Sequence, residues 1–196
     1  MEKINFIKTF IPQGDFREKY EHGGMMVRHL AAVLDEKMGA YECYECTVPI
    51  GEYDEGEIQK AFAEFSVKMD ALKLKQAKVD KIAEIAAYDT SSSVNGFVLN
   101  GLLVWLDKAT RVGLMNSTTI AKASGQETTT LWLGGLKLVV DCDKAIQLLS
   151  ALEMYALECF NVTASHKQAV SELTTIEEVE AYDYKAGYPK MLEMSI

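Results

Sequence analysis

Cys43 and Cys46 form a C-x-x-C pair, the spacing that supplies half of many zinc sites. Cys142, Cys159 and the three histidines would have to provide the remaining ligands. The pair lies in residues 41–50, which are rich in strand-forming side chains, and residues three apart on a strand face opposite sides. No second C-x-x-C follows. We therefore interpret the cysteines as structural and expect no metal and no cofactor.

Catalysis by a thiol nucleophile would need a histidine base within hydrogen-bond reach. Cys159 and His166 share one helix face, but seven residues of helix separate them by about 10 Å. Cys142 precedes a helix start, where backbone amides lower a thiol pKa, yet no base can be named for it. A cysteine enzyme stays an alternative; we expect no enzyme and interpret His166 as partly buried beside a polar neighbour.

Composition argues against several other classes. Twenty Lys and Arg against 29 Asp and Glu give a formal charge of -9, which disfavours a nucleic-acid partner and leaves an acidic DNA mimic supported by charge alone. The glycine pairs at 23–24 and 134–135 lack the spacing of phosphate-binding loops. No apolar run approaches the roughly 20 residues of a membrane span, and residues 1–5 do not open a signal peptide. Four cysteines are too few for a disulfide scaffold, which favours a reduced, cytosolic history.

The pattern of apolar residues and turns along the chain predicts an α+β protein in three segments, 1–54, 55–88 and 89–196. Residues 1–54 predict a small strand-helix-strand unit, with strands at 3–11 and 41–50. The helix between them, at 25–34, is predicted from the spacing of five apolar residues: Met26, Val27, Leu30, Val33 and Leu34.

Residues 55–88 predict one long helix, because neither proline nor, after Gly56, glycine interrupts them. A row with a period of 3.5 residues follows this helix: Ile58, Phe62, Phe65, Met69, Leu72, Gln76, Val79, Ala83 and Ala86. Such a helix is about 50 Å long, so either other helices of the chain or further copies must cover the row. We predict self-association through its first seven members, Ile58 to Val79, with Gln76 setting the register.

Charge along this helix has two interpretations. Between residues 66 and 82 the helix has five lysines, at 68, 73, 75, 78 and 81, and only two acidic residues, Asp70 and Asp80. Residues 35–57, in contrast, contain eight acidic residues and one basic residue. The pattern is typical of a solvated surface, or else the opposite charges set the orientation of contacts between copies.

Residues 89–196 contain a hairpin followed by a helix, twice. Asn100-Gly101 and Gly134-Gly135 mark the two hairpin turns, and Asn-Gly favours type I′ geometry. Asp107 and Asp143 stand where each following helix begins, and we expect both to cap it. The predicted fold is ββαββα, with one four-stranded antiparallel sheet and helices on one face.

The last helix of this repeat is predicted to be long, from Lys144 to about Leu173, because its apolar residues alternate in fours and threes. Thr175 and Glu178 fit a capping box at the start of a short acidic helix. The aromatic segment 182–189 is expected to pack back on the domain.

An ordered series of motifs within residues 84–190 resembles a domain family of unknown function from tailed phages and prophages, notably those of Bacteroides-type gut bacteria. The motifs are Tyr88-Asp89-Thr90-Ser91, Val94-Asn95, Trp105, Asp107-Lys108-Ala109-Thr110-Arg111, Thr128-Thr129-Thr130-Leu131-Trp132, Asn161-Val162-Thr163-Ala164-Ser165-His166, Glu180-Ala181-Tyr182-Asp183-Tyr184 and Gly187-Tyr188-Pro189. Related domains lie in proteins that resemble tail fibres or tail-fibre assembly proteins. The resemblance transfers a context and no catalytic residue.

Together these features predict a non-enzymatic structural or assembly protein of a phage tail. Its expected partners are further copies of itself and other phage tail or assembly proteins, and neither a membrane nor nucleic acid. The expected location is the virion, or the cytoplasm of the bacterial host during assembly. A tail-fibre assembly chaperone that is not retained in the virion is the alternative in the same setting.

Overall fold

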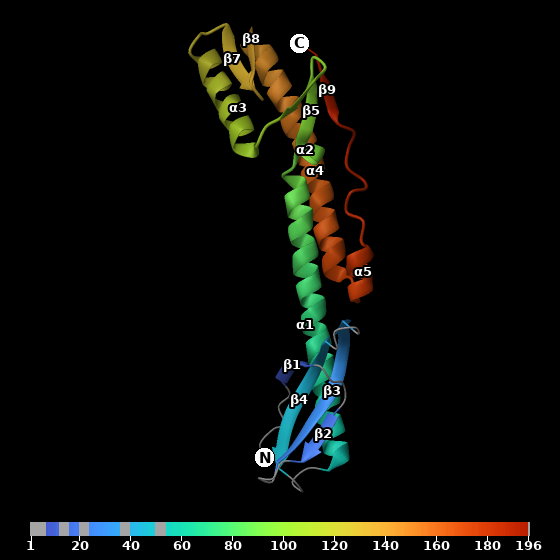
Figure 1. Ribbon diagram of the computed structural model, residues 1–196. Helices are drawn as coiled ribbons and strands as arrows, with labels where there is room; N and C mark the ends of the chain where they lie inside the picture. Colours follow the sequence, from blue (N-terminus) through green and yellow to red (C-terminus); the bar gives the residue numbers. More distant parts are fainter. Residues whose placement is uncertain (1–6, 12–15, 20–23, 36–39, 50–53, 196) are drawn as a thin grey trace. The chain divides into compact units, whose positions relative to one another are not determined.

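The computed structural model of the chain describes residues 7–11, 16–19, 24–35, 40–49 and 54–195. The protein is of mixed α+β type and has two compact units, Met1–Lys73 and Leu74–Ile196. The predicted long helix is present as α1 (Glu55–Asp89), and both units include part of it (Figure 1).

The first unit contains an antiparallel sheet with the strand order β1-β4-β3-β2. Its strands are β1 (Ile7–Ile11), β2 (Phe16–Lys19), β3 (Gly24–Asp35) and β4 (Ala40–Pro49). β1 and β4 confirm the predicted strands over residues 7–11 and 41–49. Residues 3–6 and 50, which those predictions also included, lie outside the described residues.

The prediction of a helix over residues 25–34 is wrong, because they belong to β3. β3 pairs with β4 along its length, with register shifts between Leu30 and Ala32 and between Val33 and Asp35. Such a shift places an extra residue in one strand and restarts the alternation of its faces. Apolar residues three apart, which indicate a helix in a regular pattern, therefore lie on an irregular strand here.

Local capping explains where α1 begins and ends. The Asp54 amide donates to a Glu57 carboxylate oxygen at 2.9 Å, and the Glu57 amide donates to Asp54 Oδ1 at 2.8 Å. This reciprocal pairing has the form of a capping box. At the other end, the hydroxyl of Ser91 donates to the carbonyl of Tyr88 at 2.7 Å.

The second unit has the predicted hairpin-helix repeat after α1. Its elements are α2 (Ser92–Asn95), β5 (Gly96–Leu99), β6 (Leu102–Trp105), α3 (Lys108–Ala123), β7 (Thr128–Leu133), β8 (Leu136–Asp141), α4 (Cys142–Glu172), α5 (Ile176–Ala181) and β9 (Leu192–Met194). Both hairpin turns have positive φ at their two central residues, 50° and 80° at Asn100 and Gly101 and 58° and 89° at Gly134 and Gly135. Two consecutive positive φ angles define the predicted type I′ turn.

The prediction of one four-stranded sheet is wrong. The hairpins lie in separate sheets, one with the order β6-β5-β9 and the other formed by β7 and β8 (Figure 1). β9 pairs in parallel with β5, and Phe97 lies opposite Leu192. The C-terminal strand thus occupies the edge of β5 that a second hairpin would need.

Two of the three predicted helix caps are confirmed. The Thr110 amide donates to Asp107 at the start of α3, and bonds from the Thr110 hydroxyl and amide hold the Asp107 pKa below its ordinary value. Thr175 and Glu178 form the capping box of α5. The cap of α4 is Asp141 instead of Asp143, because that helix begins at Cys142.

The core of the second unit joins both hairpins to α4. It consists of buried hydrophobic side chains from β5 to β8 and from α4, chiefly Phe97, Leu99, Val104, Leu131, Leu133, Val140, Ala145, Leu149, Leu152 and Cys159. A smaller cluster, Ile85, Val170 and Val179, joins α1, α4 and α5. This cluster thereby holds α5 against α1 and α4.

Gly96 stands where α2 ends and β5 begins, and a side chain has no room there. A Cβ atom at this position would lie 2.3 Å from the backbone oxygen of Ser92. We expect Gly96→Ala to lower the free energy of unfolding by about 2 kcal/mol, the cost of overpacking a rigid neighbour. Gly113→Ala is the matched control: a Cβ there meets nothing within 4 Å, and the helix of α3 should gain about 0.5–1 kcal/mol. Urea unfolding of both variants tests this; equal effects would contradict it.

Candidate functional site

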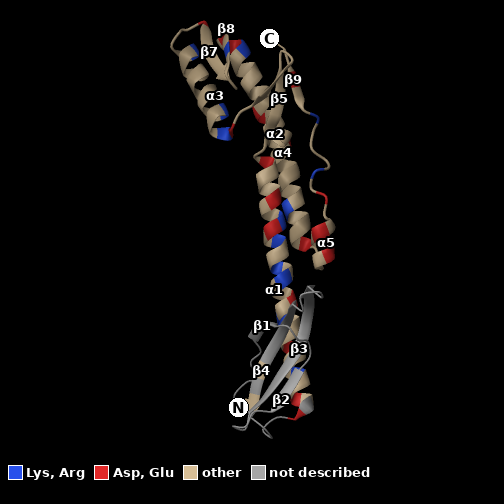
Figure 2. Ribbon diagram, in the orientation of Figure 1, with Lys and Arg blue, Asp and Glu red and all other residues tan. Residues whose placement is uncertain are grey.

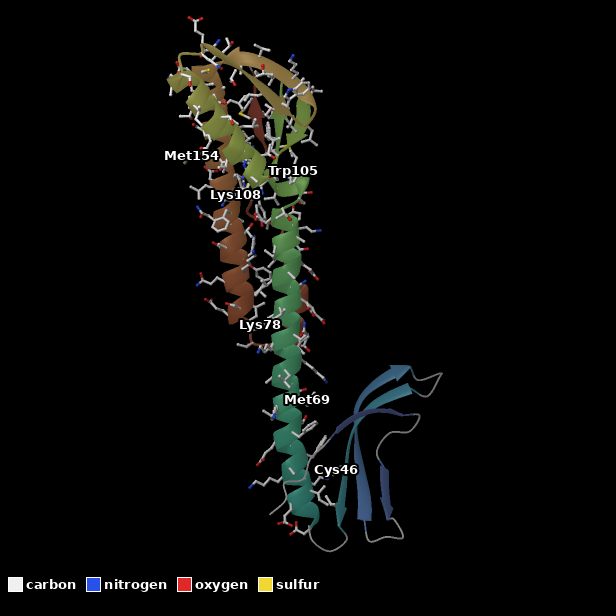
Figure 3. The ribbon with its side chains drawn as sticks, turned by 90° about the vertical axis from the view of Figure 1, so that its left-hand side faces the viewer. Cys46, Met69, Lys78, Trp105, Lys108 and Met154 are labelled. Carbon is white, nitrogen blue, oxygen red and sulfur yellow. The ribbon has the colours of Figure 1, made fainter. Side chains whose placement is uncertain are left out.

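The first four residues of the predicted interface lie against the sheet of their own unit. Ile58 is fully buried in a cluster with Cys46 and Val48 of β4. Phe62, Phe65 and Met69 pack against the same cluster. Figure 3 labels Met69 and Cys46. A sheet of the same chain therefore covers this part of the row.

The last three residues of the predicted interface are exposed. Leu72 and Val79 are 49% and 52% exposed, and Gln76 donates a hydrogen bond to Asp80 one turn later at 2.8 Å. In the second unit, α1 instead packs through other positions, namely Leu74, Ala77, Ile82 and Ile85. The exposed row Leu72–Gln76–Val79 is thus available for contact with another molecule.

Two of the lysines on α1 contact the C-terminal ends of other helices in the second unit. Lys78 Nζ donates to the carbonyl of Ser171, near the end of α4, at 2.7 Å. Lys81 Nζ donates to the carbonyl of Glu180, in α5, at 3.4 Å. Carbonyls at a helix C-terminus carry partial negative charge, so ammonium groups stabilise these ends. Figure 2 shows basic positions in blue along α1 and acidic positions in red on α5.

The described cysteines are buried and explained by their packing. Cys142 Sγ lies 3.4 Å from the carbonyl of Gln126, and Cys159 Sγ lies 3.4 Å from that of Val94. Burial raises the Cys159 pKa, which disfavours the reactive thiolate. Within the described ranges, no three His, Cys, Asp or Glu side chains gather as a metal site requires. The side chain of Cys43 lies outside the described residues.

His166 is held by two groups of the C-terminal segment. Its Nε2 lies 2.9 Å from the carbonyl of Ala186, and its Nδ1 lies 2.9 Å from the hydroxyl of Tyr182. Because a carbonyl only accepts, Nε2 carries the proton and, in the neutral ring, Nδ1 accepts from Tyr182. This half-buried histidine with polar partners agrees with its predicted structural role.

A second polar chain joins the end of α1 to α4 and the C-terminal segment. The hydroxyl of Thr163 donates to Asp89 Oδ1 at 2.7 Å and lies 2.9 Å from the hydroxyl of Tyr188. The ring of Tyr88 contacts those of Tyr184 and Tyr188 edge-on, each at 5.6 Å between centroids. We name this group, together with His166 and Tyr182, the tyrosine cluster.

No spacing in the sequence groups the members of the tyrosine cluster, although all of them lie in the motifs that carry the family resemblance. A hollow of about 280 Å³ lies beside it, lined by Asn161, Val162, Ser165, His166, Ala186 and Gly187. The polar groups of the cluster bond to one another, and the hollow is shallow. The cluster therefore fastens three segments together, and its geometry provides no catalytic arrangement.

Thr163 is 1% exposed and bonds two partners, so its hydroxyl is the centre of the cluster. We expect Thr163→Val, which keeps the shape, to lower the free energy of unfolding by about 2 kcal/mol, because the Asp89 carboxylate and the Tyr188 hydroxyl lose a buried partner. Thr163→Ser keeps the hydroxyl and should retain most of the stability. Urea unfolding measures both, and equal losses would contradict the role of the hydroxyl.

Tyr155 makes the stability of the second unit fall with rising pH in the alkaline range. Its hydroxyl donates to the carbonyl of Val94 at 2.7 Å, and burial raises its pKa from 10.0 to about 12. Above pH 10 the unfolded chain loses this proton before the folded chain does, so stability is full below pH 10 and falls as pH rises towards 12. We expect Tyr155→Phe to make the unfolding free energy less dependent on pH in this range. Unchanged pH dependence would contradict it.

Large apolar side chains are also exposed on the surface of the second unit. On α4, Met154, Leu157 and Phe160 are 60%, 49% and 58% exposed (Met154 is labelled in Figure 3). On the hairpins, Leu103 and Trp132 are 64% and 59% exposed. Exposed apolar groups that gather on one face mark sites of protein–protein contact.

Comparison with known proteins gives one finding. Residues 76–186 match the model of a family described as a domain of unknown function, DUF4376. No curated protein and no solved structure matches the chain. Among the described residues, no helix is both long and apolar enough to cross a membrane.

Proposed function

We propose that this chain, which belongs to the DUF4376 family, is a non-enzymatic structural or assembly protein that acts through protein–protein contacts and self-association. The observation that carries the proposal is the exposed row Leu72–Gln76–Val79 on α1. Its two aliphatic members are half exposed one heptad apart, which is the spacing of a helix–helix seam.

Among the side chains that the structure describes, the reactive ones of the second unit support the same proposal, since packing already accounts for them. Cys142 and Cys159 are buried against carbonyl groups, and both ring nitrogens of His166 have partners from the C-terminal segment. A nucleophile would need an accessible thiol beside a free base. The described surface offers apolar rows instead.

The biological setting of the proposal is a tailed phage or prophage, and its support is the motif resemblance within residues 84–190. We propose a component of the tail region, present in the virion or in the host cytoplasm during assembly. Mass spectrometry of purified virions tests this setting. If the protein is found in infected cells and is missing from virions, the assembly chaperone is favoured. If the gene that encodes the protein has no phage genes beside it, the phage setting is overturned.

Self-association is tested by the mass of the protein in solution. The test must leave Phe65 unchanged, because Phe65 packs against the cluster of Cys46, Val48 and Ile58 and its replacement would also disturb the fold. We expect Leu72→Asp/Val79→Asp to lower the mass measured by light scattering, because two carboxylates at a helix seam repel and remain hydrated. Val67→Asp is the matched control, since Val67 is 72% exposed on another side of α1. Identical masses for all three proteins would overturn association through this row.

A further inference from the structure

Residues 182–195 form an arm whose structure depends on the rest of the second unit. Apart from the three residues of β9, the arm contains neither helix nor strand. It runs from the end of α5 alongside α4 to the edge of the sheet β6-β5-β9 (Figure 1). We name residues 182–195 the C-terminal arm.

The end of the arm completes the sheet around β5. Leu192 and Met194 of β9 lie opposite two buried residues of β5, Phe97 and Leu99. The amide of Asn100 donates to the carbonyl of Met194 at 2.9 Å. The side chains of Leu192 and Met194 also pack against the main core of the unit. The edge of β5 and the core beside it are thus an acceptor site for an extended segment with two apolar residues two positions apart.

Polar bonds hold the middle of the arm to α4, and a hollow lies beside them. The carbonyl of Ala186 lies 2.9 Å from His166 Nε2, and the hydroxyl of Tyr188 lies 2.9 Å from that of Thr163. The hollow of about 280 Å³ is lined by Ala186 and Gly187 of the arm and by residues of α4. The arm is therefore not closely packed on α4 at these two residues, and its separation from α4 can begin there.

We propose that the C-terminal arm exchanges between copies of this chain, so that β9 of one copy pairs with β5 of a second copy. The inference rests on the proposed function, which is an assembly role through self-association. The arm contacts named above, to α4 and to β5, re-form with the same partner residues in another copy. The exchange therefore needs no new interface, because each chain already has both the acceptor site and the segment that fits it.

Length and concentration decide when the arm exchanges. An extended chain spans at most 3.3–3.6 Å per residue, so residues 182–194 reach up to about 45 Å, far enough to meet a neighbouring copy. A tethered segment competes as if it were present at a concentration on the order of 1 mM, so the isolated chain keeps its own arm. Copies that the row on α1 brings together reach a comparable local concentration, and there the arms exchange.

The experiment mixes two variants of the full chain, each with one added cysteine. The first variant is Val98→Cys on β5, and the second is Glu193→Cys on β9, at the position opposite Val98 in the register. Neighbouring strands lie about 4.8 Å apart, a separation that a disulfide can bridge. After incubation together at about 1 mM and oxidation with diamide, we expect dimers that contain one chain of each variant. Mass spectrometry of tryptic peptides identifies the disulfide between residues 98 and 193.

Leu103→Cys is the matched control for Val98→Cys. Leu103 lies opposite Val98 on β6, on the side of β5 away from β9. Because Leu103 is 64% exposed and Val98 is half-buried, random encounters between chains would join Leu103→Cys to Glu193→Cys more readily. Arm exchange predicts the opposite order. If Val98→Cys gives no more mixed dimer than Leu103→Cys does, the exchange is overturned.

The mass of Leu72→Asp/Val79→Asp in solution separates this inference from the proposed function. If the α1 variant lowers the mass but the disulfide between residues 98 and 193 does not form between chains, the exchange is overturned and the proposed function stands. If that disulfide forms between chains but the α1 variant keeps the native mass, association through α1 is overturned and the exchange stands. We expect both effects, a lower mass for the α1 variant and mixed dimers for the cysteine pair.

Discussion

Phe97→Ala is expected to lower the free energy of unfolding of the second unit by about 3–5 kcal/mol. Phe97 is fully buried, and its strand β5 is the central strand of the sheet β6-β5-β9. It pairs with Val104 on one side and with Leu192 of the C-terminal strand on the other. Removing the ring leaves a cavity between elements far apart in sequence, which the surrounding backbone cannot close.

The matched control is Leu103→Ala on the same hairpin. Leu103 is 64% exposed, so its truncation removes little buried area and should cost less than about 1 kcal/mol. Tryptophan fluorescence during urea unfolding is a suitable measurement, because both tryptophans of the chain, Trp105 and Trp132, lie in the second unit. Similar losses for the two variants would contradict the placement of Phe97 in the core.

The elements that were predicted correctly have signals within a few residues of one another. The start of α5 follows from Thr175 and Glu178, which bond each other's backbone as the sequence spacing implies. The two hairpins follow from Asn100-Gly101 and Gly134-Gly135, whose positive φ angles few other residues adopt. The length of α1 follows from the lack of any interruption. Caps, turns and uninterrupted helices can be predicted from the sequence because the residues that determine them lie in the same short segment.

The errors concern pairings between distant segments. β3 reads as a helix because two register shifts break the strand alternation, and only its pairing with β4 shows them. The three residues of β9 have no strand pattern of their own and become a strand through β5. The separate sheets of the second unit follow from that same pairing. Sequence spacing carries no information about which edge a remote segment occupies.

The candidate site shows the same limit. The row on α1 was predicted from its period, but the period alone does not say what covers it. In the structure, β4 covers the part from Ile58 to Met69, while Leu72 and Val79 stay exposed. The exposure of Leu157 and Phe160 on α4 was not predicted, because the residues that a long helix leaves exposed depend on which elements pack against it.

Glu153→Ala is expected to lower the free energy of unfolding by about 3 kcal/mol, because it leaves a buried guanidinium without its anion. Arg111, on α3, is 7% exposed, and its Nε donates to Glu153 Oε1 of α4 at 2.8 Å. Its Nη1 donates to the carbonyl of Leu106, also at 2.8 Å. This ion pair joins the first helix of the repeat to the second, so its loss also loosens the packing of α3 on α4.

The reverse change should cost less. Arg111→Met leaves a Glu153 side chain that is 35% exposed and that water can hydrate, so we expect a loss of about 1–2 kcal/mol. Arg111→Met/Glu153→Met removes both charges and should recover much of the stability lost in Glu153→Ala. The measurement is urea unfolding at a protein concentration at which the chain is monomeric, so that contacts between copies do not contribute. Equal losses for the two single variants would show that burial of the Arg111 charge is not the cause.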